Sequence, residues 1–185
     1  IEGSDPILKD EAILVGAHLD GQGNTGILLP GALDNATGVA NILEVARALA
    51  QLEAKPKRSV AFIFIGAEEC GLVGSSHFVK NPTFPKEKTV CFINLDMVGN
   101  GTGLTVWGAE SYPDIHEYFK KANSDFIHRN FLSSPSRIPR TRPRSDAAVF
   151  LKAGYKAVSL GTTNRLKPVN YHHPNDKPEL TITPE

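Results

Sequence analysis

The sequence predicts an α/β protein, namely a three-layer α/β/α sandwich around a mixed, mostly parallel central sheet. Short apolar runs rich in β-branched residues recur along the chain, as in strands that are covered on both faces. Segments with helical spacing of apolar residues lie between these runs, and such alternation is typical of a layered α/β domain. At 185 residues, with 41% apolar and 22% charged side chains, residues 1–185 are expected to form a single domain.

Four apolar runs and one weaker run predict the strands. They are Ala12–Ala17, Val60–Ile65, Val90–Leu95, Leu104–Trp107 (the weaker one) and Lys156–Leu160. The clearest helix begins near Asn35, because apolar residues recur at i, i+3, i+4 and i+7 from Val39 to Ala50, and Pro56 marks its end. Weaker helices are predicted after Gly74, from Pro113 at the N1 position, and from Ser145 as N-cap to Gly154.

Three segments fit neither pattern. Residues Asp125–Arg144 have no clear period and contain three prolines, so they are predicted to form a functional surface loop. Ile1–Gly3 resembles the end of a strand and Thr183–Glu185 the first turn of a helix, so flanking elements are expected to be missing at both ends. Gly21–Gly26 matches a dinucleotide-binding Gly-x-Gly-x-x-Gly pattern, but no helix can start there, and we interpret it as a flexible turn.

Composition argues against several classes of protein. The 20 basic and 20 acidic residues cancel, so nucleic acid or an anionic membrane is not expected as a partner. The longest apolar run, Val60–Ile65, is far shorter than the ~18 residues of a membrane span. Cys70 and Cys91 are too few for a disulfide framework, and both are predicted to be buried thiols. The chain starts without a charged-then-apolar leader, as a processed chain or fragment would, so it does not assign a compartment.

Polar residues cluster where the predicted strands end. His18 and Asp20 follow the first strand, Glu68 and Glu69 the second, Asp96 ends the third, Tyr171–Asp176 follow the last, and Asp34 precedes the long helix. Because ligands of open α/β sheets bind beyond the carboxyl ends of the strands, we expect these side chains to converge.

Each of these residues alone has an ordinary structural interpretation. Asp34 can be a helix N-cap, the two glutamates a solvated turn, and His172 part of a surface loop. However, two unpaired carboxylates directly after a buried strand would repel each other, and a bound cation removes that conflict. Imidazole and carboxylate groups gathered at strand ends therefore predict a metal site.

Five segments in this order resemble the motif series of the co-catalytic dizinc exopeptidases. They are Gly16-Ala-His-Leu-Asp20, Pro30-Gly-Ala-Leu-Asp-Asn-Ala-Thr-Gly38, Gly66-Ala-Glu-Glu-Cys-Gly-Leu-Val-Gly-Ser75, Asn94-Leu-Asp-Met-Val-Gly99 and Tyr171-His-His-Pro-Asn-Asp176. That superfamily includes bacterial leucyl-type aminopeptidases, glutamate carboxypeptidase and glutaminyl cyclase. The resemblance runs from about Ile7 to Glu185 and implies the same α/β/α fold.

The resemblance implies a site with two Zn²⁺ ions, for which cobalt or manganese are possible substitutes. It places one ion on His18 and Asp96 and the other on Glu69 and His172, with the Asp34 carboxylate bridging both. His172 is chosen over its neighbour by the family's Tyr-His-x-x-x-Asp pattern, which ends here at Asp176, a residue that supports the ligands.

Further roles follow from the same resemblance. Glu68 corresponds to the general base, which takes a proton from a water that bridges the metals and delivers it to the leaving amine. Asp20 is expected to accept the other imidazole N–H of His18. A cis peptide is implied at Asp34–Asn35. Where the family usually has Ser-Asp-His, this chain has Ser145-Asp-Ala147, so part of the substrate-side wall differs.

Three functions remain open from the sequence. The leading hypothesis is an aminopeptidase that acts on peptide substrates, and the resemblance suggests a secreted or periplasmic protein. The alternatives are a glutaminyl cyclase-like acyltransferase with a single zinc, or a peptidase-like binding module that has lost activity. Zinc content separates them: two ions per chain, one, or none. Oligomeric state and the preferred side chain of the substrate are not predicted.

Four arginines on the proline-rich segment are interpreted as a solvated basic loop, with recognition of a substrate carboxylate as the alternative. They are Arg137, Arg140, Arg142 and Arg144.

Overall fold

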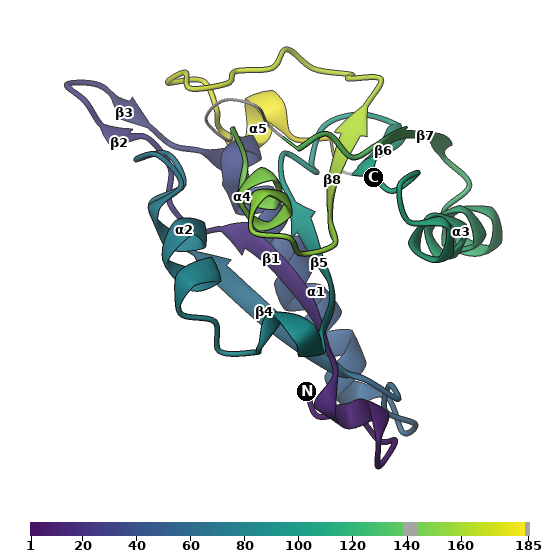
Figure 1. Cartoon of the computed structure of the whole chain (residues 1–185). Coiled ribbons are helices and arrows are strands. Elements are labelled where there is room, and N and C mark those ends of the chain that lie inside the picture. Colours follow the sequence, from purple (N-terminus) through teal and green to yellow (C-terminus); the bar gives the residue numbers. More distant parts are fainter. Residues whose placement is uncertain (139–143, 184–185) are drawn as a thin grey trace.

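Six strands form one mixed sheet in the order β4-β1-β5-β8-β6-β7 (Figure 1). The computed structural model describes residues 1–138 and 144–183. The strands are β1 (Ala12–His18), β4 (Ser59–Ile65), β5 (Thr89–Leu95), β6 (Gly103–Gly108), β7 (Asn130–Pro135) and β8 (Ala157–Thr163). Neighbouring strands are parallel except β6 and β8, which pair in antiparallel fashion. The prediction of a mixed, mostly parallel sheet is confirmed.

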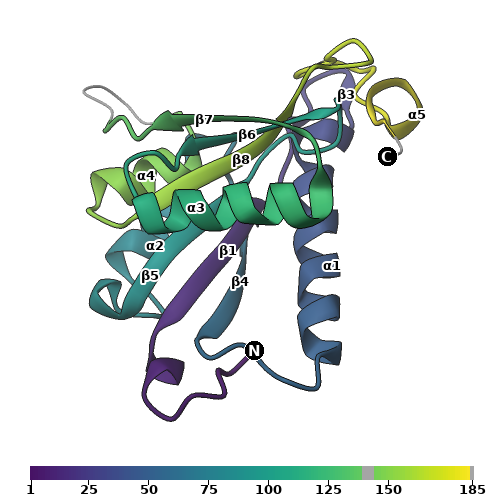
Figure 2. The ribbon, with the colours of Figure 1, turned by 90° about the vertical axis from the view of Figure 1, so that its right-hand side faces the viewer.

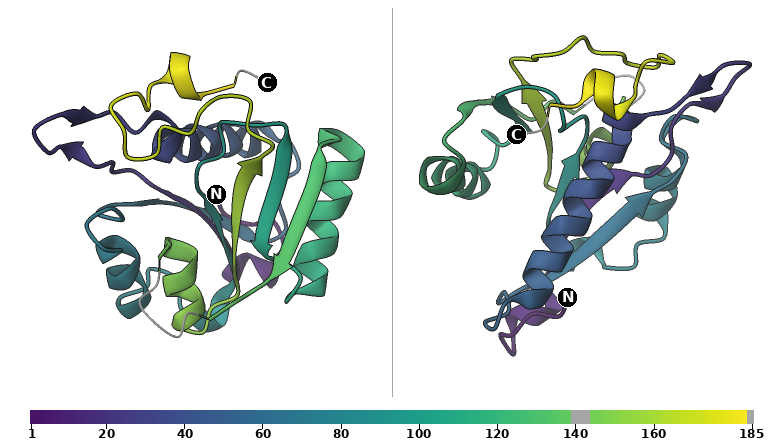
Figure 3. Two further views of the ribbon diagram at one scale, coloured as in Figure 1. Left: turned by 90° about the horizontal axis from the view of Figure 1, so that it is seen from above. Right: turned by 180° about the vertical axis from the view of Figure 1, so that it is seen from behind.

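Helices cover both faces of this sheet. They are α1 (Thr37–Gln51), α2 (Val73–Lys80), α3 (Pro113–Ala122), α4 (Asp146–Lys152) and the short α5 (Pro178–Thr181). Figures 2 and 3 show α1 on one side of the sheet and α2 with α4 on the other. Short 3₁₀ or π turns lie at Leu8–Asp10, Ala32–Ala36, Lys86–Lys88 and Asn123–Ile127, and a two-stranded hairpin is formed by β2 (Gly23–Asn24) and β3 (Leu28–Leu29).

The alternation of side chains along β1 explains why its apolar run is continuous. Leu14 points to the layer of α2 and α4, where Phe150 stacks on Phe92 with ring centroids 3.9 Å apart. Val15 points to the opposite layer and packs with Ile42 of α1. Because both faces of the strand are buried, apolar residues are needed at consecutive positions rather than at every second one.

The structure corrects the prediction for Asp125–Arg144. This segment contains β7, an edge strand that runs parallel to β6 and is half exposed. Exposed and half-buried positions alternate along β7, so it lacks the continuous apolar run of the strands that pack into the core on both faces. Arg140 and Arg142 lie outside the described residues.

Other predictions have mixed outcomes. Cys91 is buried in β5, but the prediction for Cys70 is wrong, because this thiol is exposed in the turn that follows β4.

The glycine-rich segment forms the β2–β3 hairpin rather than the start of a helix, as expected. Ile1 pairs with Val60 of β4, while Thr183 is not helical and residues 184–185 lie outside the described ones. None of the helices in the described ranges is long and apolar enough to cross a membrane.

Candidate metal centre

The loop that carries Asp34 is held against the carboxyl end of β5. Gly31 opens the loop with φ of +72°, and a Cβ there would lie 2.6 Å from the Asp34 carbonyl oxygen. The implied cis peptide between Asp34 and Asn35 is confirmed. The buried Asn35 amide donates to the Leu95 carbonyl oxygen at 2.9 Å and accepts from the backbone N–H of Met97 at 3.2 Å. These bonds fix the loop beside the strand that ends at Asp96.

Asp176 holds the same loop from the other side. Its carboxylate is buried and accepts the backbone N–H groups of Leu33 at 2.8 Å and Asp34 at 3.2 Å. The C-terminal segment that presents His172 is thereby tied to the loop that presents Asp34, although the two lie far apart in sequence. Asp176 therefore acts through the backbone around the candidate ligands.

Five side chains expected to hold metal converge in two groups. In the first, the His18 Nε2 atom lies 3.1 Å from Asp34 Oδ1 and 3.8 Å from Asp96 Oδ1. In the second, the His172 Nε2 atom lies 3.3 Å from Asp34 Oδ2 and 3.0 Å from Glu69 Oε2. The donor atoms of each group lie within 4.8 Å of one another. Asp34 belongs to both groups and directs one oxygen to each.

The chemistry of these groups fits zinc. Each offers one imidazole nitrogen and two carboxylates, which are ordinary zinc ligands, and three protein ligands are the number that catalytic zinc sites use beside a water or substrate. The His18 and Asp34 side chains are only 2% and 6% exposed. Three carboxylates at such close range repel one another unless positive charge lies between them. A cavity of about 10 Å³ beside Asp34, Glu69 and His172 has the size of a single small species.

Comparison with known proteins identifies the family. The sequence profile of Peptidase family M28 matches residues 1–184. The chain belongs to peptidase family M28. Over 155 residues this M28 chain is 33% identical to leupeptin-inactivating enzyme 1 of Streptomyces exfoliatus. The matched region covers 82% of this chain and 32% of that enzyme. Over 92 residues it is 42% identical to an aminopeptidase of Pseudomonas aeruginosa, covering 49% of the chain and 16% of the relative.

Solved structures of two bacterial aminopeptidases share this fold. The zinc aminopeptidase BSAP from Bacillus subtilis superposes with a TM-score of 0.76 at 28% identity, over 98% of this chain and 44% of that one. The Legionella pneumophila LapA aminopeptidase superposes with a TM-score of 0.71 at 29% identity, over 95% and 48% of the two chains. The M28 chain thus spans less than half of the length of each of these relatives.

Asp20 of the M28 chain lies at the other ring nitrogen of His18, as expected, and its contact there is through the main chain. The Nδ1 atom of His18 lies 3.0 Å from the Asp20 backbone carbonyl oxygen and 3.8 Å from its carboxylate. The carboxylate instead accepts the backbone N–H groups of Glu68 at 3.0 Å and Glu69 at 3.1 Å. The main chain of Asp20 therefore orients the His18 imidazole, and its side chain holds the backbone of Glu68 and Glu69. Asp20 can do both because it lies in the turn that directly follows β1.

Glu68 is a half-buried carboxyl group beside the two M28 clusters. Burial raises its pKa to about 7, and the negative charges of Asp146, Asp96 and Glu69 act in the same direction. The nearby His18 opposes the shift. A carboxyl group with a pKa near neutrality can take up and release a proton at physiological pH, which is the property that a general base and acid needs.

Asp146 was not among the expected site residues. It lies at the start of α4, where Ser145 is the N-cap and accepts the Ala148 N–H at 3.3 Å. Asp146 is 1% exposed, and neither of its oxygens has a hydrogen-bond partner among the described residues. Burial raises the pKa of Asp146 to about 6, and the nearby Ser75 hydroxyl opposes part of this rise. The Ser75 hydroxyl itself donates to the Leu72 carbonyl oxygen. The charge of Asp146 is one of the causes of the raised pKa of Glu68.

Two further residues contact His172, and only Gln22 was missed by the sequence analysis. Gln22, from the glycine-rich segment, donates to Glu69 Oε2 at 2.6 Å and lies 3.3 Å from His172 Nε2. The Tyr171 ring stacks on the His172 imidazole at a centroid distance of 3.6 Å. No sequence period places Gln22 there, because the contact joins segments 150 positions apart.

The state of His18 predicts that the zinc affinity of the M28 domain rises with pH. Burial disfavours a charge on His18, but the Asp34 and Asp96 carboxylates outweigh this effect and raise its pKa to about 11. Zinc binds the neutral imidazole and must displace a proton at any lower pH. We expect the apparent affinity to rise by up to about tenfold per pH unit between about pH 6 and pH 8, measured by competition with a chelator of known pH dependence. A flat profile would contradict this expectation.

Proposed function

We propose that this chain is the catalytic domain of a zinc-dependent aminopeptidase with two Zn²⁺ ions. The observation that carries the proposal is the position of Asp34, whose two carboxylate oxygens face two separate groups of zinc-ligand side chains. In the proposed site, His18 and Asp96 hold one ion, Glu69 and His172 hold the other, and Asp34 is shared. The names of the aminopeptidase relatives support the direction of cleavage from the N-terminus.

The protein side chains set where the reaction occurs. When bound, two zinc ions would supply Lewis acidity for the scissile carbonyl and lower the pKa of a water molecule. Asp20 fixes the backbone of Glu68 and Glu69 through two N–H bonds, so the neighbouring carboxyl groups keep separate directions. Glu69 is directed to His172, while Glu68 makes no contact with either imidazole among the ion pairs of the described residues.

Glu68 is proposed to move the proton. As a carboxylate it accepts a proton from the attacking water, and as a carboxylic acid it donates that proton to the amine that leaves. Burial and the surrounding carboxylates raise the pKa of Glu68 in the protein without metal, which makes it a better proton acceptor than an exposed glutamate.

The proposal is tested by hydrolysis and metal content measured on the same protein. We expect about two zinc ions per chain and hydrolysis of aminoacyl anilides, with N-acetylated versions of the same substrates left intact. Removal of zinc by a chelator should abolish hydrolysis, and added Zn²⁺ should restore it. Cleavage of N-blocked peptides would contradict aminopeptidase specificity. One zinc with cyclisation of N-terminal glutamine would indicate a cyclase, and no zinc with no hydrolysis an inactive module.

A further inference from the structure

Two adjoining cavities lead away from the candidate metal centre. The nearer one, of about 280 Å³, is lined by Asp96, Met97 and Arg165 among others. The farther one, of about 400 Å³, lies between α4 and the start of the segment that follows β7. Trp107, Ser145 and Ser159 line both cavities. A substrate placed at Asp96 can therefore extend a side chain past these shared walls into the farther cavity.

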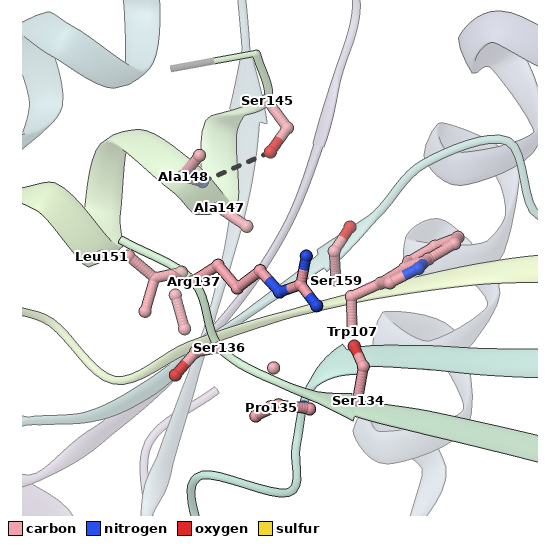
Figure 4. Close-up of a pocket in the computed structure, with 12 residues that line it drawn as sticks. Trp107, Ser134, Pro135, Ser136, Arg137, Ser145, Ala147, Ala148, Leu151 and Ser159 are labelled. Carbon is pink, nitrogen blue, oxygen red and sulfur yellow. Dashed lines mark hydrogen bonds between the residues drawn. The ribbon is translucent and has the colours of Figure 1, made fainter. Parts of the chain in front are cut away.

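Arg137 gives the farther cavity its chemical character. It is the one charged residue among the described residues that line this cavity, and the other walls are small or neutral side chains such as Ser134, Ser136 and Ala147. Figure 4 shows the guanidinium directed across the cavity toward Ser159 and Trp107. Within the described ranges, no acidic side chain forms an ion pair with Arg137 and none lines the cavity.

We infer that the farther cavity receives the side chain of the substrate residue at the cleaved bond, and that Arg137 selects a carboxylate there. The inference rests on the proposed aminopeptidase function and names its substrate class: peptides with an N-terminal glutamate or aspartate. A guanidinium presents paired N–H donors that match a carboxylate, and such charge-assisted bonds are stronger than neutral ones. The serine hydroxyls of the walls offer donors for the remaining carboxylate lone pairs.

The cation is available to a substrate rather than used in the fold. Arg137 is exposed and makes no hydrogen bond with a described residue that would have to be broken. Since the other described residues of the wall are neutral, a cationic side chain such as lysine would be repelled by Arg137 without a compensating carboxylate from them. The cavity is thus expected to rank substrates by charge, in the order acidic, neutral, basic.

The test compares substrates that differ only in charge. Anilides of glutamate and glutamine have nearly the same shape, and wild-type protein should hydrolyse the glutamate substrate with about a tenfold higher kcat/KM, as one charge-assisted pair supports. Arg137→Met keeps an unbranched, flexible side chain like the aliphatic part of arginine and removes the cation, so the ratio should fall to about one, mainly through KM. Arg144→Met is the matched control, because Arg144 is exposed on the same segment and lines neither cavity. Its ratio should equal that of wild type.

The outcomes separate this inference from the proposed function. If both substrates are hydrolysed but Arg137→Met leaves their ratio unchanged, or if Arg165→Met abolishes the preference instead, the inference is wrong and the aminopeptidase proposal stands. If nothing is hydrolysed, the aminopeptidase proposal fails. Calorimetric binding of glutamate α-hydroxamate and glutamine α-hydroxamate to zinc-loaded protein then decides the inference: a preference of about tenfold for glutamate that Arg137→Met removes supports it, and equal binding overturns it.

Discussion

Glu68→Gln is expected to lower kcat by a factor of about 10²–10⁴ while both zinc ions stay bound. Glutamine keeps the size and shape of the side chain, but its amide does not accept a proton at neutral pH. The loss should appear in kcat and in kcat/KM alike, because the proton is transferred in the transition state and not on substrate binding. Steady-state kinetics and metal analysis of the same preparation measure both quantities.

The neighbouring glutamate provides the matched control. Glu69 is within 3.0 Å of the His172 Nε2 atom, so Glu69→Gln should weaken the retention of one zinc ion. The two variants have the same change of charge and chemistry at adjacent positions, and they differ only in which carboxylate is lost. Zinc loss from the Glu68 variant, or near-normal turnover by it, would show that the two roles have been assigned wrongly.

Asp34→Asn should weaken the binding of both zinc ions at once. Asparagine keeps the shape of the side chain and leaves the backbone N–H bond to Asp176 in place, so the loop is expected to fold. It removes the negative charge and one of the two oxygens that face the two ligand groups. Replacing groups that merely support a ligand costs about 10–100-fold in metal affinity, so a shared ligand should cost at least as much at each position.

Asp96→Asn is the comparison that makes the result specific. Asp96 belongs only to the group with His18, so its replacement should weaken one ion and leave the other unchanged. Zinc titration against a competing chelator distinguishes one weakened step from two, and circular dichroism checks that each variant is folded. If Asp34→Asn weakened a single step, as Asp96→Asn does, the shared position of Asp34 would be refuted.

Specific structural features explain where the sequence analysis succeeded. The runs at β1, β4, β5 and β8 contribute side chains to the core on both faces of the sheet, which requires continuous apolar residues that are visible in the sequence. The long helix was predicted for a similar reason, since one face of α1 packs on the sheet. Where this requirement is relaxed, as at the exposed edge strand β7 and the turn that holds Cys70, the predictions were wrong.

The sequence by itself determined the fold class, the strands that are followed by polar residues, and the residue types that are able to bind metal. These depend on local burial and on chemistry carried by single residues. Only the tertiary structure decided that Asp34 turns one oxygen to each ligand group, that Asp20 contacts His18 through its carbonyl oxygen, and that Arg137 faces a cavity near Asp96. Such contacts join segments distant in sequence and are set by how loops pack across the sheet edge, for which no local pattern exists.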